Sequence, residues 1–423
     1  MSAVRSLRFD RIFVGPVGRL IRGQKPKEMY LTSFIHRQML FDIAERWISG
    51  SPGPRDVRSL TEILICDGFV VGEALETMAK RLLGMIYKPP FRQRHIRFKG
   101  ELRDVICRDD RDGNPRVREL SARYIENPDY YYREAPINGV VCLDPQDHLL
   151  GLYRIKRPKR IAEKANRRIA DWIFDKVRGR AQEMAAERAR LSGVPLDLFV
   201  TPPEEMAKEF VRAEVIMARS FRDGGIRFES SAMTIHDVGA IKIVAGEDEL
   251  RQLEKALSQA PDITIVERED FRGYYQATNL VLQVPWDAAS ICKRYREIRG
   301  WEKYLDRGIP EKDLRKGLEP FLPGAEPKIN IELILSTFPA MVESELGNSI
   351  HEERIIAQRE NKRYKGYIPM NVEFLVESLF AVGFSPMTDA DHVPIKLWGR
   401  YLPETLGSYI RRLYNLPEHD LSG

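Results

Sequence analysis

Residues 154–164 read Arg-Ile-Lys-Arg-Pro-Lys-Arg-Ile-Ala-Glu-Lys and mark the point where a strand gives way to a long helix. The residues from Gly151 to Lys156 alternate apolar and polar side chains as a short strand does. Pro158 ends the strand because it has no N–H to donate, and helical spacing of apolar residues begins near Lys159. The stretch therefore predicts a strand-to-helix junction at which positive charge is concentrated.

Three cations of this junction are expected to converge. Arg154 and Lys156 stand two residues apart, so on a strand both side chains point to one face, and Lys164 can return to that face from the first turns of the helix. A guanidinium holds two oxygens at once and an ammonium acts as a point charge, so such a group suits a polyphosphate. The alternative is a solvated basic helix start, which is the commoner fate of a Lys/Arg run.

The spacing resembles the donor-nucleotide motif of the RelA/SpoT family of (p)ppGpp synthetases, in which an Arg-x-Lys pair is followed by an Ile and then by a Lys. The matching residues are Arg154, Lys156, Ile161 and Lys164, and Arg160 stands where the family often has Ser. The resemblance implies a nucleotidyltransferase domain in which Arg154, Lys156 and Lys164 bind ATP.

Two later strands continue this resemblance. Residues 236–244 are similar to the family's Asp-Ile-Ala-Gly-x-Arg strand, with Asp237 at the magnesium-binding position and Lys242 where Arg is usual. Residues 329–337 are similar to its Glu-x-Gln-x-Arg-Thr strand and keep Glu332. The resemblance implies that Asp237 and Glu332 form the catalytic pair and bind Mg²⁺, and that Lys242 joins the ATP-binding cations. It also implies that Glu332 helps to activate the attacking hydroxyl.

Pyrophosphoryl transfer from ATP needs a cradle of cations, a hard metal ion and a group that orients or deprotonates the attacking hydroxyl. Magnesium usually takes only one or two protein carboxylates, which Asp237 and Glu332 could supply. Two carboxylates held close together repel each other. We therefore expect one of the pair to have a raised pKa before metal binds, and metal binding to release protons.

The acceptor half of the resemblance is incomplete. The family's acceptor loop ends Gly-Tyr-x-Ser-x-His, and Gly273 and Tyr274 match it and are the expected acceptor-binding residues. The loop is short and has lost its usual lysines, Thr278 stands where His is expected, and Ile334 and Ser336 replace Gln and Arg. A guanosine nucleotide would need the missing cations for its phosphates.

Two functions remain open. The first is an ATP-dependent pyrophosphokinase that transfers pyrophosphate to a hydroxyl of a nucleotide or of RNA. Small toxic members of the family modify tRNA ends, which makes tRNA a candidate acceptor by analogy. The second is a catalytically inactive nucleotide-sensing or partner-binding protein on the same fold. The resemblance would link either one to alarmones and the stringent response.

Composition limits the class of protein. The 423 residues, 43% hydrophobic and 30% charged, suffice for a sizeable core, and a net charge of +5 does not indicate a strongly basic nucleic-acid binder. Four scattered cysteines without a CxxC pair argue against a zinc site and a disulfide framework. Residues 1–22 mix charges with apolar residues and predict neither a signal peptide nor a membrane span. We expect a cytoplasmic protein without a membrane partner, and the sequence leaves its oligomeric state open.

The order of patterns predicts an α/β (α+β) fold with a mixed five-stranded sheet flanked by helices. The strands are expected near residues 150–157, 239–245, 263–267, 278–284 and 329–336. His36 lies in the first expected helix, where we interpret it as a packing or surface histidine and not as a ligand.

We divide the chain into three regions. Residues 1–139 are expected to form a mainly helical N-terminal lobe. Residues 140–368 should form the synthetase-like domain, with insertions near 170–230 and 286–328, the second of which we place near the acceptor side. Residues 369–423 should form a C-terminal helical cap.

Overall fold

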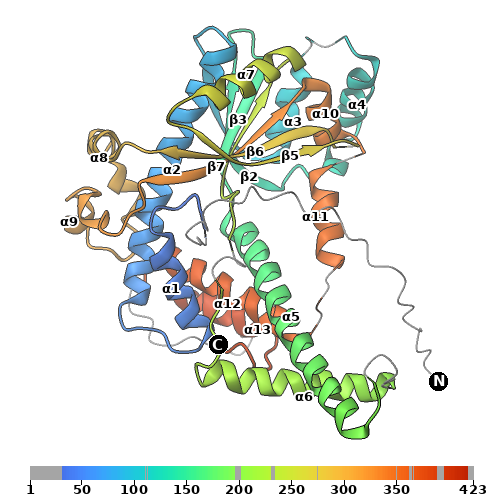
Figure 1. The fold of residues 1–423 in the computed structure, drawn as a ribbon. Coiled ribbons are helices and arrows are strands. Elements are labelled where there is room, and N and C mark those ends of the chain that lie inside the picture. The colour runs from blue at the N-terminus through green and yellow to red at the C-terminus, as the bar shows by residue number, and fades with distance from the viewer. Residues whose placement is uncertain are drawn as a thin grey trace.

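The structure is a computed structural model that describes residues 31–109, 111, 113–195, 202–229, 234–273, 275–348, 350–361, 364, 366–387 and 395–417. Within these residues the chain forms thirteen α-helices and one mixed sheet of seven strands, so the predicted α/β class is confirmed (Figure 1). The strand order is β1-β2-β3-β4-β7-β6-β5. The strands are β1 (Arg92–Phe98), β2 (Pro136–Leu143), β3 (Leu149–Ile155), β4 (Gly239–Val244), β5 (Thr264–Phe271), β6 (Ala277–Pro285) and β7 (Lys328–Ser336).

The sheet has two strands more than the five that were predicted. The five predicted strands correspond to β3 to β7, whereas β1 and β2 were missed. β1 lies at the sheet edge, and Ile96 is the one buried residue among its seven, so the alternation that reveals a strand is absent. The sheet therefore begins within residues 1–139, where mainly helices were expected.

The register of the central strands determines which side chains share a face. β4 pairs with β7 in parallel and with β3 antiparallel, which sets Ala240 opposite both Arg154 and Glu332. Directly opposed residues point to the same face of a sheet, so Arg154 and Glu332 lie on one face. Gly151 allows β3 to approach β4 closely, because a Cβ there would lie 2.5 Å from the backbone oxygen of Lys242.

Each face of the sheet carries its own layer of helices. On one face, α2 (Asp56–Ile86) packs against β3 and β4, with α1 (Arg37–Ile48) beside it and α7 (Glu247–Gln259) against α2 and β5 (Figure 1). On the other face, apolar residues of β1 to β3 pack with those of α3 (Lys99–Arg108), α4 (Pro115–Glu126) and α10 (Phe338–Leu346). The functional residues described below lie on this second face.

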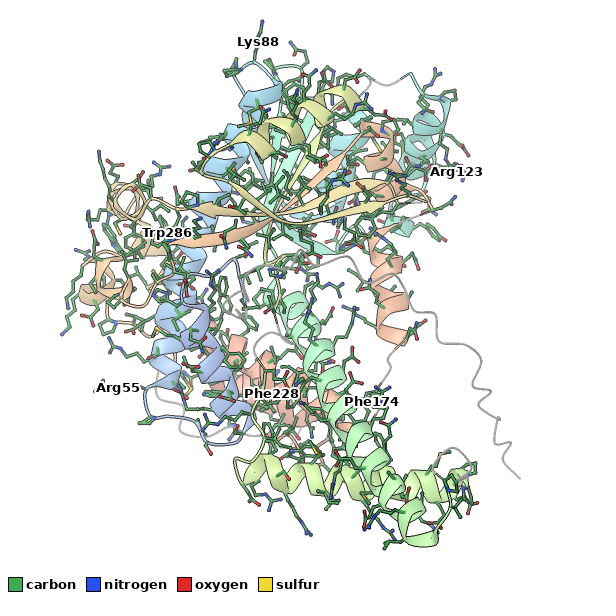
Figure 2. The ribbon with its side chains drawn as sticks, viewed as in Figure 1. Arg55, Lys88, Arg123, Phe174, Phe228 and Trp286 are labelled. Atoms are coloured by element: carbon green, nitrogen blue, oxygen red, sulfur yellow. The ribbon has the colours of Figure 1, made fainter. Side chains whose placement is uncertain are left out.

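A long helical arm leaves the sheet directly after β3. It consists of α5 (Pro158–Ser192) and α6 (Pro203–Arg222), and α12 (Tyr367–Phe384) and α13 (Glu404–Leu413) pack beside its base (Figure 1). The ring of Phe174 lies 5.8 Å from that of Phe210 and 5.4 Å from that of Tyr364, and Figure 2 labels Phe174 on α5. The expected insertion near 170–230 thus forms most of the arm, and the expected C-terminal cap contains α12 and α13.

α12 is the one helix among the described residues that is long and apolar enough to cross a membrane. Within its 18 residues, 61% are buried inside the protein. It packs against α2, α5 and α13. A helix that is apolar on most sides and covered by neighbouring helices is typical of a protein core, so its composition follows from this packing.

The excursion at 286–328 does not lie where we expected it. Its helices are α8 (Ala288–Glu297), η3 (Gly300–Tyr304), α9 (Glu311–Leu314) and η4 (Glu319–Phe321), at the left in Figure 1. Tyr295 packs edge-on against Phe69 of α2 with ring centroids 5.0 Å apart, and Trp286, labelled in Figure 2, donates to the backbone oxygen of Glu326 at 2.7 Å. The excursion thus covers α2, and none of its described residues lines the cavity on the opposite face.

Candidate functional site

A cavity of about 330 Å³ opens on the sheet face that points away from α2. We call it the main cavity. Side chains of β3, β4, β6 and β7 form its floor, and α3, α5, α10 and α11 (His351–Glu360) form its walls. Three carboxylates and eight cations line it: Asp237, Glu332 and Glu345, with Lys99, Arg154, Lys156, Arg160, Lys164, Arg167, Lys242 and Arg354. All six residues predicted to bind ATP or metal are among these.

Asp237, two residues before the start of β4, is held by two lysines. The ammonium groups of Lys156 and Lys164 both donate to its Oδ2. Lys156 also donates to Oε2 of Glu332 at 3.2 Å, so a single ammonium joins the two predicted metal-binding carboxylates. The strand-to-helix junction therefore brings Lys156 and Lys164 to Asp237.

Burial and charge act against each other at this cluster. Burial tends to raise the pKa of Asp237, but Lys156 and Lys164 outweigh it and hold the pKa well below its usual value. The pKa of Lys164 falls to about 8, because burial and the nearby charge of Lys156 outweigh the attraction of Asp237. We expected repulsion between the two carboxylates to raise the pKa of one of them. For Asp237 the pKa is lowered instead, because Lys156 and Lys164 lie beside its carboxylate.

The oxygen atoms at this position are suited to a hard divalent cation. Asn279 of β6 donates to Oε1 of Glu332 at 3.4 Å, while its own side-chain oxygen is buried and has no hydrogen-bond partner among the residues that the structure describes. Asp237 and Glu332 add carboxylate oxygens to this cavity wall. Magnesium prefers such oxygen ligands, and a cation, the Lys156 ammonium, already lies between the two carboxylates. These three residues could therefore hold Mg²⁺.

Arg154 and Lys242 differ from the two lysines because neither forms an ion pair with any residue that the structure describes. Burial is the main cause that lowers the pKa of Arg154. Burial, aided by Lys99 and Arg154, also lowers the pKa of Lys242 to about 8, although Glu345 acts in the opposite direction. The Nζ atom of Lys242 contacts the sulfur of Met341 at 3.4 Å. Two cations of the floor thus point into the cavity without a carboxylate partner, which favours an anionic ligand.

Ion pairs of Lys99 and Arg103 lie at one end of the main cavity, which we call the inner end. Lys99 of α3 lies 2.7 Å from Oε2 of Glu345, and Arg103 lies 2.7 Å from Oε2 of Glu352. Burial, together with the charge of Lys99, lowers the pKa of His351 to about 2, so this histidine is neutral near pH 7. The inner end is thus a charge network fixed by the fold.

Of the two acceptor residues predicted from the sequence, the structure places Gly273 and does not describe Tyr274. Gly273 lines a separate surface groove with Gln276, and Tyr274 is outside the described residues. Tyr275 lines the main cavity instead, and the guanidinium of Arg354 stacks 4.3 Å from the centre of its ring.

The sequence analysis missed several residues of the cavity. The acceptor motif lacks its usual cations, and Lys99 and Arg354 bring other cations to the cavity from α3 and α11. The sequence analysis did not identify these two residues because they lie far from the acceptor loop in sequence. A detectable signal existed for Asn279, which is a polar residue directly before the apolar run 280–282 of β6.

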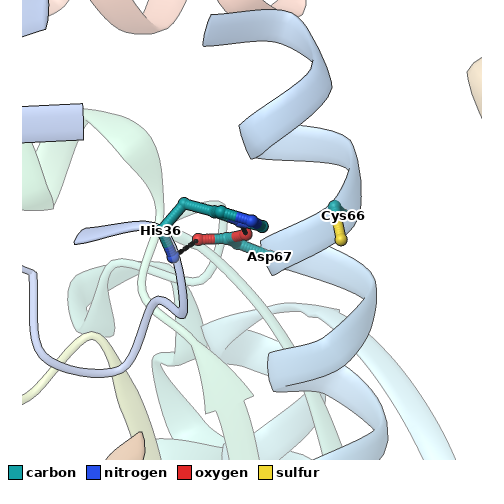
Figure 3. Close-up of side chains that lie close together, drawn as sticks. All are labelled: His36, Cys66 and Asp67. Carbon is teal, nitrogen blue, oxygen red and sulfur yellow. Dashed lines mark hydrogen bonds and ion pairs between the residues drawn. The ribbon is translucent and has the colours of Figure 1, made fainter. Parts of the chain in front are cut away.

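His36, Cys66 and Asp67 form a second, buried cluster between α1 and α2 (Figure 3). The backbone nitrogen and Nδ1 of His36 lie 2.9 and 2.6 Å from the two carboxylate oxygens of Asp67, so both oxygens are engaged. Burial raises the pKa of the Cys66 thiol, which keeps the thiol protonated in this structure. His36 therefore anchors the start of α1 on α2, and its buried Nε2 has no hydrogen-bond partner among the described residues.

Comparison with known proteins gives a distant structural likeness only. No family model matches the chain, and no curated protein matches it. The crystal structure of the small alarmone synthetase 1 from Bacillus subtilis is similar at 13% identity and a TM-score of 0.19, over 44% of this chain and 71% of that chain. The structure of that synthetase bound to its product pppGpp gives 12% identity and a TM-score of 0.20, over 40% and 69%. A likeness this distant supports neither an activity nor a substrate for this chain.

Proposed function

We propose that the main cavity binds ATP with Mg²⁺ and transfers pyrophosphate to a hydroxyl group of a nucleotide or an RNA acceptor. The observation that supports this function is the array of Arg154, Lys156, Lys164 and Lys242 on one sheet face with Asp237, Glu332 and Asn279. Cations in this number suit a polyphosphate, and the three oxygen-bearing side chains suit the metal ion that accompanies it.

The residues would divide the reaction as follows. Lys156, Lys164 and Arg154 hold the phosphates of ATP. When bound by Asp237 and Glu332, Mg²⁺ would neutralise the charge that develops on the phosphate oxygens during transfer. The acceptor hydroxyl oxygen bonds to the β-phosphorus, the bond from that phosphorus to the α,β-bridging oxygen breaks, and AMP leaves. Glu332 takes the hydroxyl proton.

The inner end of the cavity supports an acceptor that carries negative charge of its own. Lys242 has no carboxylate partner among the described residues, and Arg354 is stacked on Tyr275 with its guanidinium edge available for hydrogen bonds. A base can stack on an aromatic ring and a phosphate can pair with these cations, so a nucleotide or the end of a tRNA meets both requirements.

A second candidate function is nucleotide sensing without turnover. Its support is the ion-paired state of the carboxylates, since Lys156 and Lys164 both donate to Asp237 and these contacts must open before a metal ion can bind. A protein that only binds the polyphosphate could keep its lysines in this arrangement. The cellular setting we propose for either function is the cytoplasm, within alarmone signalling of the stringent response.

Incubation with γ-labelled ATP, Mg²⁺ and a panel of nucleotides and tRNA tests the proposal. We expect label in one acceptor class together with release of unlabelled AMP. Glu332→Gln is the matched control because it keeps the shape and removes the charge, and it should lower the transfer rate by about 10²- to 10⁴-fold while ATP still binds. If wild-type protein releases no AMP with any acceptor, the enzyme is excluded and the sensing function remains.

A further inference from the structure

A second cavity, of about 210 Å³, lies next to the main cavity between α5, α11 and the start of α12. We call it the side pocket. Arg167 and Gln358 line both cavities and separate them. Ala170, Tyr364 and Pro369 give the side pocket an apolar part. At about 30 Å³ for each water molecule, this volume holds roughly seven waters. Pockets for drug-sized ligands begin at about 300 Å³, so the side pocket suits a single small heterocycle.

The side pocket contains a buried amide that is half satisfied. Asn166 of α5 is 6% exposed, and its Nδ2 donates to Glu373 of α12 at 3.2 Å. This bond fixes the orientation of the amide, because a carboxylate accepts only from the nitrogen. The side-chain oxygen of Asn166 is buried and has no hydrogen-bond partner within the described part of the chain. An unsatisfied buried acceptor is unfavourable, and an N–H group of a ligand would relieve that cost.

Gln358, which lines the side pocket, carries a hydrogen-bond donor as well. The Oε1 atom of Gln358 accepts from Arg160 at 3.1 Å and from Arg167 at 3.4 Å, which turns the amide nitrogen of Gln358 away from those two arginines. That nitrogen has no partner among the described residues. The side pocket therefore offers one acceptor, on Asn166, and one donor, on Gln358.

Charge distinguishes the side pocket from the main cavity. Two cations and three carboxylates line the side pocket, whereas eight cations and three carboxylates line the main cavity. Both cations of the side pocket are engaged, since Arg359 pairs with Glu163 at 2.5 Å and Arg167 donates to Gln358. A phosphate group would therefore prefer the main cavity, and a neutral ligand would prefer the side pocket.

We propose that the side pocket is a second ligand site that takes a neutral nitrogen heterocycle of nucleobase size. Its amino group donates to the side-chain oxygen of Asn166, and its ring nitrogen accepts from the amide of Gln358. This site does not depend on the proposed pyrophosphokinase activity. Because Arg167 and Gln358 also line the main cavity, a base bound here lies against residues that contact the proposed phosphate site.

Calorimetric titration of the full chain with adenine and cytosine tests the site, since both bases carry an amino group beside a ring nitrogen. Unsubstituted purine is the matched control ligand because it lacks the amino group. We expect at least one amino base to bind saturably, and adenine, if it binds, to do so about tenfold more tightly than purine, as the loss of one hydrogen bond to a buried acceptor implies. Absence of saturable binding by either base overturns the proposal.

Three variants locate the binding. Asn166→Leu removes the acceptor and Ala170→Leu fills the cavity without touching a polar group, so each should weaken the bound base about tenfold or more. Lys156→Ala alters only the main cavity and should leave base binding unchanged while it weakens binding of inorganic pyrophosphate. Base binding that survives both side-pocket variants, or that is lost in Lys156→Ala, overturns the proposal. The comparison of adenine with purine on the wild-type chain stands even if a variant fails to fold.

Discussion

The main cavity and the side pocket lie on two faces of the same helix and differ in charge. Residues 160, 164 and 167 of α5 bring cations to the main cavity, whereas residues 163, 166 and 170 bring a carboxylate, an amide and a methyl group to the side pocket. An α-helix repeats every 3.6 residues, so positions three and four apart stay on one face. One basic stretch of helix can therefore line two sites of different charge, and α11 lies between these sites.

The largest expected effect concerns the buried ion pair of Lys99 with Glu345 at the main cavity. Glu345 is 5% exposed and accepts from Lys99 at 2.8 and 2.7 Å. Glu345→Gln would leave the charges of Lys99 and Arg103 with one carboxylate fewer. We expect the free energy of unfolding to fall by about 3–5 kcal/mol, as for other buried ion pairs that lose one partner. Urea denaturation followed by circular dichroism measures this change.

Glu183→Gln is the matched control for that experiment. Glu183 pairs with Arg180 at 2.8 Å on the exposed surface of the arm, where its side chain is 67% exposed. Exposed ion pairs contribute at most about 1 kcal/mol, so the control should shift the unfolding midpoint little. Equal shifts in the two variants would show that the buried ion pair of Glu345 contributes no more to the free energy of unfolding than an exposed pair does.

Arg154 allows a test of whether the two cavities bind different ligands. Arg154 lines the main cavity and not the side pocket. Arg154→Ala should weaken ATP binding by about 1–3 kcal/mol, the range for a charge-assisted hydrogen bond, and should leave binding of adenine or cytosine unaffected. Titration calorimetry with each ligand measures both effects. Arg154→Lys keeps the charge without the bidentate fork and should fall between the wild type and Arg154→Ala. An unchanged dissociation constant for ATP would remove Arg154 from the phosphate cradle.

The smallest expected effect is a difference in pH dependence. Lys164 and Lys242 of the main cavity each have a pKa of about 8. Both are charged below that pH and lose their protons above it. ATP affinity should therefore be full below about pH 7 and should decline towards pH 9, by about tenfold for each lysine, since a group of pKa 8 is then about nine-tenths deprotonated.

Titrations between pH 7 and 9 measure this decline, and the amino base of the side pocket provides the internal control because its binding should stay flat. Lys164→Arg should remove the part of the decline in ATP affinity that Lys164 causes, since a guanidinium keeps its charge over this pH range. A flat ATP affinity in the wild-type chain would mean that neither lysine contributes charge to phosphate binding.

Much of the floor of the main cavity could be predicted from the sequence. Arg154 and Lys156 stand two apart on a strand, and Lys164 follows after two turns of a helix, so local periodicity alone indicated that the three cations converge. Asp237 and Glu332 came from the resemblance to a family of synthetases, and the parallel pairing of β4 with β7 brings them near each other. The three cations could be predicted because the periodicity of a strand or a helix is visible within a few residues of sequence.

The walls of both cavities could not be predicted in this way. Lys99 and Arg354 enter the main cavity from helices that lie far from the motifs in sequence, and Asn166 meets Glu373 across 207 residues. β1 carries charges along an exposed edge and gives no alternating pattern. No local pattern encodes which distant helix will pack beside a strand, because packing depends on the shapes of whole surfaces.

The amino-acid sequence by itself determined the strand-to-helix junction, the α/β class and the face on which its cations lie, because backbone periodicity and the hydrogen-bonding limits of proline act locally. Only the tertiary structure decided that lysines and not mutual repulsion set the pKa of Asp237, and that α11 divides one charged helix between two cavities. Electrostatic interactions depend on distance in space and on burial, and both exist only once the chain has folded.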